Sequence, residues 1–250
     1  MSSDSVRDTG PGVAGGDSTV GNHDVWLIVP CFNEGTVIEE VLRSARGTFP
    51  NIVAVDDGSA DNSAAAIHRA GAHLVRHPVN LGQGAAIQTG VEYARAQPGA
   101  RYFVTFDADG QHQVKDVLTM VERVRSEPVD IVVGTRFGRP RRDDDQVPLI
   151  KRLVLRTVVL LSPRTRRLGL TDAHNGLRVF NRRVAEDLNL RMNGMSHASE
   201  FVELMDSRGW RVAEQPVDIL YTEYSMSKGQ SLLNGINILS DGFVGKRLPR

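Results

Sequence analysis

The chain has 250 residues, with 30 basic and 30 acidic side chains and a single cysteine. This length suits one sizeable domain with a real hydrophobic core, and the even charge balance argues against nucleic acid as a partner. The lone Cys31 excludes a disulfide within the chain, so a reducing cytoplasm is the expected compartment.

The N-terminal segment 1–23 is rich in Gly and Ser and shows no apolar periodicity, which predicts a disordered tail. It lacks the basic start and apolar core of a secretory signal. No uninterrupted apolar run in the chain reaches the ~18 residues that a membrane-spanning helix needs. We therefore expect a single domain over residues 24–250 that does not cross a membrane.

Short, continuous apolar runs alternate with helical patterns from Val25 to about Gly134. Such runs are typical of strands covered on both faces, and the alternation predicts an α/β fold with a mostly parallel, Rossmann-like sheet flanked by helices. The predicted strands are "VWLIVP" (25–30), "NIVAVDD" (51–57), a short "HLVRH" (73–77), "YFVTFDAD" (102–109) and "DIVVGTR" (130–136). The predicted helices cover residues 34–46, 61–70, 83–95 and 114–126.

The second half of the chain, residues 137–250, is less regular. Residues 139–167 carry nine Arg or Lys against three Asp, interleaved with apolar residues. This stretch is either an ordinary helix with a solvated face or a helix that lies on an anionic membrane surface. Further on, the pattern predicts a loop that enters a strand at 171–183, a helix at 197–210 and a strand at 211–221.

Polar motifs follow several predicted strands, where ligands bind in open α/β sheets. The motif "DDGSAD" (56–61) is either a turn whose Ser59 or Asp61 caps the next helix, or a set of carboxylates that accept hydrogen bonds from a nucleotide.

The segment "NLGQGAAIQTG" (80–90) resembles a dinucleotide fingerprint, but Ile87 stands where the third glycine should be. Its small residues indicate either a closely packed helix or a backbone that approaches a nucleotide at Gly82 and Gly84. The failed fingerprint argues against an NAD-dependent oxidoreductase.

The motif "DADGQH" (107–112) places two carboxylates at the end of a strand. Hard cations such as Mg²⁺ take one or two carboxylates together with substrate phosphates, so this motif is a candidate metal site, with Gln111 or His112 near enough to contribute. A solvated acidic turn is the alternative. Arg136 and Arg178 are either solvated or suited to phosphate.

In combination these motifs resemble the inverting family 2 glycosyltransferases, which have the GT-A fold. The resemblance rests on "PCFNE" (30–34), "DDGSAD" (56–61), "NLGQGAAI" (80–87), "DADGQH" (107–112), "GTR" (134–136), "DAHNGLRVF" (172–180) and "SKGQS" (227–231). Within that family the chain looks most like the polyprenyl-phosphate sugar synthases of the dolichyl-phosphate mannosyltransferase type. It departs from them at Gln83 and Gln113, where Lys or Arg and Pro are frequent, and in lacking an Arg shortly before "SKG".

The resemblance implies a role for particular side chains. The residues implied to bind the nucleotide sugar are Pro30, Glu34, Asp57, Gly82, Gly84, Asp107 and Ala108. The residues implied to hold Mg²⁺ or Mn²⁺ are Asp107, Asp109 and Gln111. Those implied to address phosphate are Arg136, Arg178 and Lys228, and the acceptor-side acids are Asp172 and, as a second candidate, Glu200.

The function implied is metal-dependent, inverting transfer of a sugar from a UDP- or GDP-sugar to a membrane lipid, with polyprenyl phosphate as the expected acceptor. A hydroxyl acceptor would need a carboxylate to take its proton, whereas an ionised phosphate would not, so Asp172 is either a base or an orienting group. The alternatives are transfer to a glycan or a small soluble acceptor, and a non-catalytic nucleotide-binding module. A lipid acceptor predicts a peripheral location on the inner face of the cell membrane, reached through an anionic surface or a small membrane protein partner.

Overall fold

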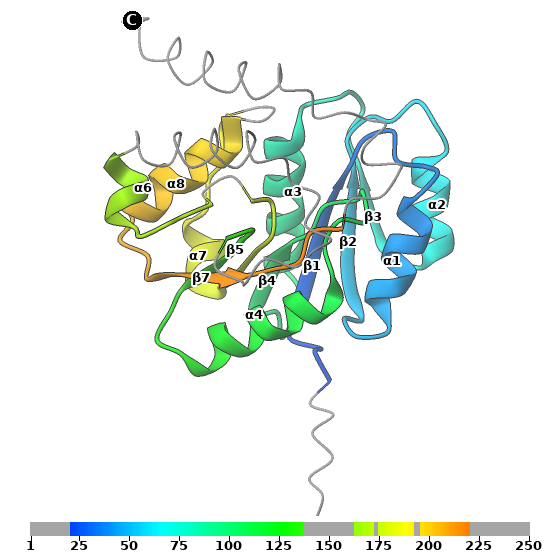
Figure 1. Ribbon diagram of the computed structural model, residues 1–250. Helices are drawn as coiled ribbons and strands as arrows, with labels where there is room; N and C mark the ends of the chain where they lie inside the picture. Colours follow the sequence, from blue (N-terminus) through cyan, green and yellow to red (C-terminus); the bar gives the residue numbers. More distant parts are fainter. Residues whose placement is uncertain (1–20, 138–162, 173–174, 193–195, 221–250) are drawn as a thin grey trace, which may run out of the picture.

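The computed structural model describes residues 21–137, 163–172, 175–192 and 196–220 (Figure 1). The strands are β1 (Val25–Cys31), β2 (Asn51–Asp56), β3 (His73–Arg76), β4 (Tyr102–Thr105), β5 (Ile131–Thr135), β6 (Arg178–Asn181) and β7 (Val212–Pro216). The helices are α1 (Ile38–Arg46), α2 (Ser63–Ala70), α3 (Gln83–Arg95), α4 (Val114–Ser126), α6 (Pro163–Arg167), α7 (Arg182–Asp187) and α8 (His197–Ser207).

The seven strands form one sheet in the order β3-β2-β1-β4-β6-β5-β7. Every neighbouring pair is parallel except the two that involve β6, which runs antiparallel to β4 and to β5. The carboxyl ends of the other six strands therefore lie at one edge of the sheet. Because β6 runs the opposite way, its first residue, Arg178, reaches that same edge and pairs with Thr105 of β4.

Two helical layers cover the sheet (Figure 1). Side chains of β1 alternate between them, as the period of two in a strand requires. Leu27 and Val29 pack in a cluster with residues of α1, α2 and α4, whereas Trp26 and Ile28 pack in a second cluster with residues of α3, α7 and α8. A strand buried on both faces must be apolar throughout, which explains the continuous apolar runs in the sequence.

The predicted strands and helices are largely confirmed, including the short third strand, but two helices start later than predicted. Helix α1 begins at Ile38 and α2 at Ser63, because the residues before each helix bind one another instead. Of the two predicted caps of α2, Ser59 is wrong, whereas Asp61 accepts through Oδ1 from the amide of Ser63, the first residue of the helix, over 2.9 Å. The residue before α2 is Asn62, whose side chain makes no cap hydrogen bond, and the Ser59 hydroxyl accepts from the amide of Asn33.

The less regular second half contributes β6 and β7 to the same sheet and α7 and α8 to one face. Of the basic stretch 139–167, only α6 lies within the described residues. Two of its arginines are paired: Arg164 lies 3.2 Å from Glu203, and Arg167 lies 2.6 Å from Asp206. Within the described ranges, none of the helices has the length and apolar character to cross a membrane.

A buried carboxylate binds neighbouring strands together at the edge opposite to the carboxyl ends, and its two arginine partners are exposed. Asp130, 1% exposed, precedes β5 and accepts hydrogen bonds from Arg211, Asn181 and Arg183. The hydrogen bonds from Arg211 hold the pKa of this carboxyl well below its ordinary value. The arrangement joins the strands β5, β6 and β7 at this edge.

We expect Asp130→Ala to lower the free energy of unfolding by about 1–3 kcal/mol, because the substitution leaves the side chain of Asn181 and the amide of Arg211 without their acceptor. Thermal denaturation followed by circular dichroism measures the loss. Glu186→Ala is the matched control, since Glu186 forms an exposed pair with Arg182 within one helix, worth less than about 1 kcal/mol. Equal melting temperatures for the two variants would contradict the prediction.

Candidate active site

Two loops at the carboxyl ends of β1 and β2 are bound to each other. The amide of Asn33 donates to the hydroxyl of Ser59, and the amide of Glu34 donates to the hydroxyl of Ser63, both at 2.9 Å. Asn33 has a left-handed backbone with φ of 55°, which an asparagine tolerates well. These bonds give the "PCFNE" motif a defined path along the edge of the sheet.

Asp57 is buried, and residues that follow β3 occupy both of its oxygens. The amides of Leu81 and Gly82 donate to Oδ1 and Oδ2, over 2.9 and 2.7 Å. His77 places Nδ1 2.7 Å from Oδ1, and its Nε2 lies 3.0 Å from the Thr89 hydroxyl on α3. Asp57 therefore organises the turn that leads into α3, and contact with a base or ribose would use its remaining lone pairs.

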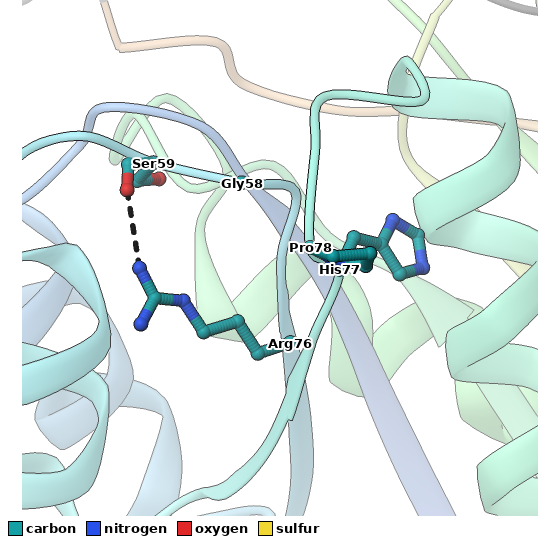
Figure 2. Close-up of a pocket in the computed structure, with 5 residues that line it drawn as sticks. All are labelled: Gly58, Ser59, Arg76, His77 and Pro78. Atoms are coloured by element: carbon teal, nitrogen blue, oxygen red, sulfur yellow. Dashed lines mark hydrogen bonds between the residues drawn. The ribbon is translucent and has the colours of Figure 1, made fainter.

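A hollow of ≈ 430 Å³ lies beside this turn, lined by Gly58, Ser59, Arg76, His77 and Pro78 (Figure 2). Arg76 reaches from the end of β3 to the carbonyl of Ser59, while the ring of His77 points to the opposite side (Figure 2). Asp107 and Asp109 do not line the hollow. It lies at the ends of β2 and β3, across β1 from β4.

Asp107 follows β4 and is held from two directions. His112 places Nε2 2.9 Å from Oδ2, and the side-chain amide of Gln83, at the start of α3, donates to Oδ1 over 3.2 Å. Burial by itself would raise the pKa of Asp107. The hydrogen bond from His112, together with the electrostatic influence of His112, Arg178 and His197, outweighs burial and lowers it. Asp107 is therefore a carboxylate at neutral pH.

Asp109 lies in the same loop, in surroundings that disfavour the ionised form of its carboxyl group. Burial and the negative charge of Asp107 raise the pKa of Asp109 to about 6, and Glu34 adds to the rise. The amide of Gln111 donates to Oδ1 of Asp109 over 3.0 Å, and the carbonyl of Gln111 accepts from the amide of Leu220. Glu34 and Asp107 therefore lie close enough to Asp109 to act on it electrostatically.

The donor set fits Mg²⁺ or Mn²⁺. In the described part of the chain, no three His, Cys, Asp or Glu side chains gather in a way that could hold a metal ion by themselves. Hard cations that act on phosphates commonly take one or two carboxylates and complete their shell with phosphate and water oxygens. Two carboxylates that raise each other's cost of ionisation fit such a cation, because its charge relieves their repulsion.

Arg178 has an exposed fraction of 0% and lies beside this loop with unused hydrogen-bonding capacity. Its guanidinium stacks over the ring of Phe201 at 4.5 Å, and Nη1 makes a long bond of 3.4 Å to the carbonyl of Gly176. Among the residues that the structure describes, Nε and Nη2 have no hydrogen-bond partner. Burial lowers the pKa of Arg178 to about 10, against the opposing effect of Asp107 and Asp172, so the group stays charged at neutral pH.

Asp172 is 2% exposed and forms a two-pronged ion pair with Arg136. Nε and Nη2 of Arg136 each donate to one oxygen of Asp172 over 2.6 Å. Glu214 of β7 accepts from the amides of Thr171 and Asp172 and fixes this turn. In this arrangement both oxygens of Asp172 accept hydrogen bonds from Arg136. For Asp172 to act as a general base, or for Arg136 to bind phosphate, this ion pair would have to open.

The geometry gives Glu200 and Gly84 structural roles. Both oxygens of Glu200 accept from the amides of Arg191 and Met192, which anchors the chain before α8.

A Cβ at Gly84 would overlap the carbonyl oxygen of Met192 and approach His197, so this glycine lets α3 pack against that same segment. At Gly84 the close neighbour is therefore the protein's own backbone, which favours the closely packed helix over an approach to a nucleotide at this glycine.

The remaining predicted residues lie at or near the same edge. Pro30 is half-buried near the end of β1, Ala108 is buried between the two aspartates, and Gly82 has a positive φ of 94° at the start of α3. Lys228 lies outside the described residues. The sequence did not single out His77 or Glu214, and it marked Gln83 only as a departure from the family pattern. His77 directly follows the short strand β3, and a polar residue at the carboxyl end of a strand is the signal that could have identified it.

Comparison with known proteins agrees with this geometry. The family model described as Glycosyl transferase family 2 matches residues 26–188. An uncharacterized protein of Methanocaldococcus jannaschii is 33% identical over 88% of this chain and 91% of its own length. The UDP-N-acetylglucosamine–dolichyl-phosphate N-acetylglucosaminyltransferase of Methanococcus voltae is 28% identical over 86% of this chain and 92% of its own.

Solved structures show the same fold at low sequence identity. Glucosyl-3-phosphoglycerate synthase of Mycobacterium tuberculosis, in complex with Mn²⁺ and UDP-glucose, has a TM-score of 0.67 and 17% identity over 89% of this chain and 77% of that one. Mannosyl-3-phosphoglycerate synthase of Rubrobacter xylanophilus has a TM-score of 0.68 and 15% identity over 91% of this chain and 76% of that one. The chain is therefore a glycosyltransferase of the GT-A fold and belongs to glycosyl transferase family 2.

Proposed function

We propose that this chain transfers a sugar, with inversion, from a nucleotide-sugar donor to the phosphate of a polyprenyl lipid, in a reaction that depends on Mg²⁺ or Mn²⁺. The observation that carries the acceptor assignment is Arg178. In the described part of the protein, two nitrogens of this buried guanidinium have no partner, which is a costly arrangement that a bound anion would explain. An anion beside Asp107 would give these nitrogens their partners.

The donor would lie along the carboxyl edge of the sheet. Its diphosphate would meet Asp107 and Asp109 at the end of β4, and its nucleoside would extend across β1 toward Asp57 and the hollow. Adjacent strands are ~4.8 Å apart, so β4 and β2 are separated by about 10 Å, which suits the length of a nucleoside diphosphate. Pro30 and Glu34 lie on the strand and loop between, and Gly82 presents the start of α3 to the donor.

In the reaction, the acceptor oxygen forms a bond to the anomeric carbon while the bond from that carbon to the donor's phosphate oxygen breaks. The divalent cation, when bound, stabilises the negative charge that develops on the leaving nucleoside diphosphate. Arg178 adds positive charge in a buried setting, where it acts strongly. A phosphate acceptor is already ionised, so no base is needed and Asp172 orients Arg136 instead.

A lipid acceptor places the enzyme at the inner face of a membrane as a peripheral protein. The relative from Methanococcus voltae is named for transfer to dolichyl phosphate, and the relative from Rhizobium johnstonii is named as a dodecaprenyl-phosphate galacturonate synthase, 34% identical over 51% of this chain and 40% of its own. These names support the acceptor class. Because Arg164 and Arg167 are paired with acids of α8, contact with an anionic surface would rest mainly on other residues.

The test is a transfer assay with matched acceptors. Purified protein is incubated with Mn²⁺ or Mg²⁺ and a panel of UDP-, GDP- and dTDP-sugars, with either a short polyprenyl phosphate or the same polyprenol without phosphate. We expect mass spectrometry to detect a sugar-phosphate lipid from one donor, only with the phosphorylated lipid, and none after EDTA.

Each part of the proposal has its own contrary outcome. Transfer to the polyprenol hydroxyl or to a soluble sugar would overturn the acceptor assignment and leave the chain a glycosyltransferase. Full activity in EDTA would overturn the metal dependence. Nuclear magnetic resonance of the product reports the anomeric configuration, and retention of the donor's configuration would overturn inversion.

A further inference from the structure

His112 is turned back toward the core and onto Asp107. Its side chain is 3% exposed, and its ring meets Phe106 edge-on with the centroids 5.6 Å apart. Nε2 lies 2.9 Å from Oδ2 of Asp107. The ring is therefore clamped between an aromatic core residue and a carboxylate, a position in which it can orient Asp107 but faces away from solvent.

The chemistry of the pair assigns the proton. An ionised carboxylate only accepts hydrogen bonds, so Nε2 of His112 must carry a proton and donate. The other nitrogen, Nδ1, is buried and has no hydrogen-bond partner in the described part of the protein. All the hydrogen bonding of this ring is thus directed at one oxygen of Asp107.

The opposite oxygen of Asp107 has a donor of its own. Gln83, the first residue of α3, donates from Nε2 to Oδ1 over 3.2 Å, and the backbone at Gly176 passes so close to Oδ2 that a Cβ there would overlap it. The carboxylate is fixed by the loop, by α3 and by the chain that leads into β6. Since a carboxylate has about four lone-pair sites, each oxygen keeps capacity for a cation.

We infer that His112 is a positioning residue, which donates Nε2–H to Asp107 and thereby sets the carboxylate orientation that binds the divalent cation, rather than binding the cation itself. The inference rests on the proposed metal dependence. Partners that orient a metal-binding side chain typically change metal affinity by about 10–100-fold when they are removed. Gln83 donates to Oδ1 of Asp107 over a longer distance of 3.2 Å and would orient the carboxylate in the same way.

The test measures Mn²⁺ affinity directly. Mn²⁺ is titrated into wild-type protein, His112→Leu and His112→Gln in the presence of UDP or GDP, and free Mn²⁺ is followed by electron paramagnetic resonance. We expect His112→Leu to bind Mn²⁺ about 10–100-fold more weakly. Glutamine carries an amide N–H at nearly the position of Nε2, so we expect His112→Gln to recover most of the affinity. Thermal denaturation of each variant reports on folding.

The outcomes separate the inference from the proposed function. Wild-type Mn²⁺ affinity in folded His112→Leu, or equally weak binding in folded His112→Gln, would overturn the positioning role. If His112→Leu does not fold, His112→Gln is compared with Gln83→Met instead. We expect His112→Gln to retain the Mn²⁺ affinity of wild type and Gln83→Met to bind Mn²⁺ more weakly. Weaker binding by His112→Gln than by Gln83→Met would overturn the positioning role. Mn²⁺ binding by wild type without sugar transfer would reject the proposed reaction and leave the role of His112 intact, whereas no binding by wild type would overturn both.

Discussion

Asp109→Asn is expected to abolish turnover and, at the same time, to make the ligand-free protein more resistant to heat. Turnover with Mn²⁺ should fall by on the order of 10³-fold, because the variant removes one of two carboxylates proposed to hold the cation that stabilises the leaving group. The melting temperature at pH 8 should rise by about 2–4 °C. Loss of activity through misfolding would give the opposite shift in melting temperature.

The sign of the stability change follows from the pKa. Burial and the charge of Asp107 raise the pKa of Asp109 from an ordinary value of 3.8 to about 6, so the ionised form is less favourable in the folded protein than in the unfolded chain. This cost is absent below pH ~4, grows as the pH rises to about 6 and is complete above it. Asparagine removes the charge, and solvent screening limits the gain to on the order of 1 kcal/mol. The stabilisation should therefore vanish at pH 4.

The control for this prediction is Glu92→Gln, which also removes one acid, but from the exposed face of α3, where Glu92 contacts Gln88. It should change the free energy of unfolding by less than about 0.5 kcal/mol and leave turnover unchanged. Mn²⁺ with a nucleoside diphosphate should stabilise wild type and Glu92→Gln but not Asp109→Asn, since only a bound ligand shifts the melting temperature. Stabilisation of Asp109→Asn by Mn²⁺ would contradict the metal assignment.

Arg178→Met is expected to lower turnover strongly without lowering the stability of the protein. Methionine fills much of the space of the arginine stem over Phe201, and replacement of a buried charge by an apolar side chain is often neutral or stabilising. Two nitrogens of the guanidinium have no partner within the described ranges, so little of the described hydrogen bonding is lost. Turnover should nevertheless fall by on the order of 10²–10³-fold, because a buried positive charge no longer faces the reacting phosphates.

Steady-state kinetics with separate variation of donor and lipid measures the effect of Arg178→Met, and chemical denaturation measures stability. Arg178→Lys is the matched variant, since it keeps the charge but loses the planar fork, and intermediate activity is expected. A larger rise in KM for the lipid phosphate than for the donor would support contact with the acceptor. Wild-type turnover in Arg178→Met would remove this residue from the reaction.

Most strands and helices in the first half of the chain can be predicted from the sequence alone. Strands β1, β2 and β4 are continuous apolar runs, which only a sheet covered on both faces can bury, and α3 and α4 begin and end at the predicted residues. The starts of α1 and α2 escaped prediction because side chains such as Ser59 bind a neighbouring loop rather than their own helix. Contacts between loops distant in the chain leave no periodic signal.

The family, the α/β class and the edge of the sheet that carries Asp57, Asp107 and Asp109 could be predicted, because local patterns place these carboxylates directly after buried strands. The contacts of each side chain could not, because they come from the tertiary structure. The antiparallel course of β6 brings Arg178 beside Asp107, and the turn before β6 ties Asp172 to Arg136, which follows β5. These two relations depend on strand direction and on segments about 40 to 70 residues apart, which no short stretch of sequence encodes.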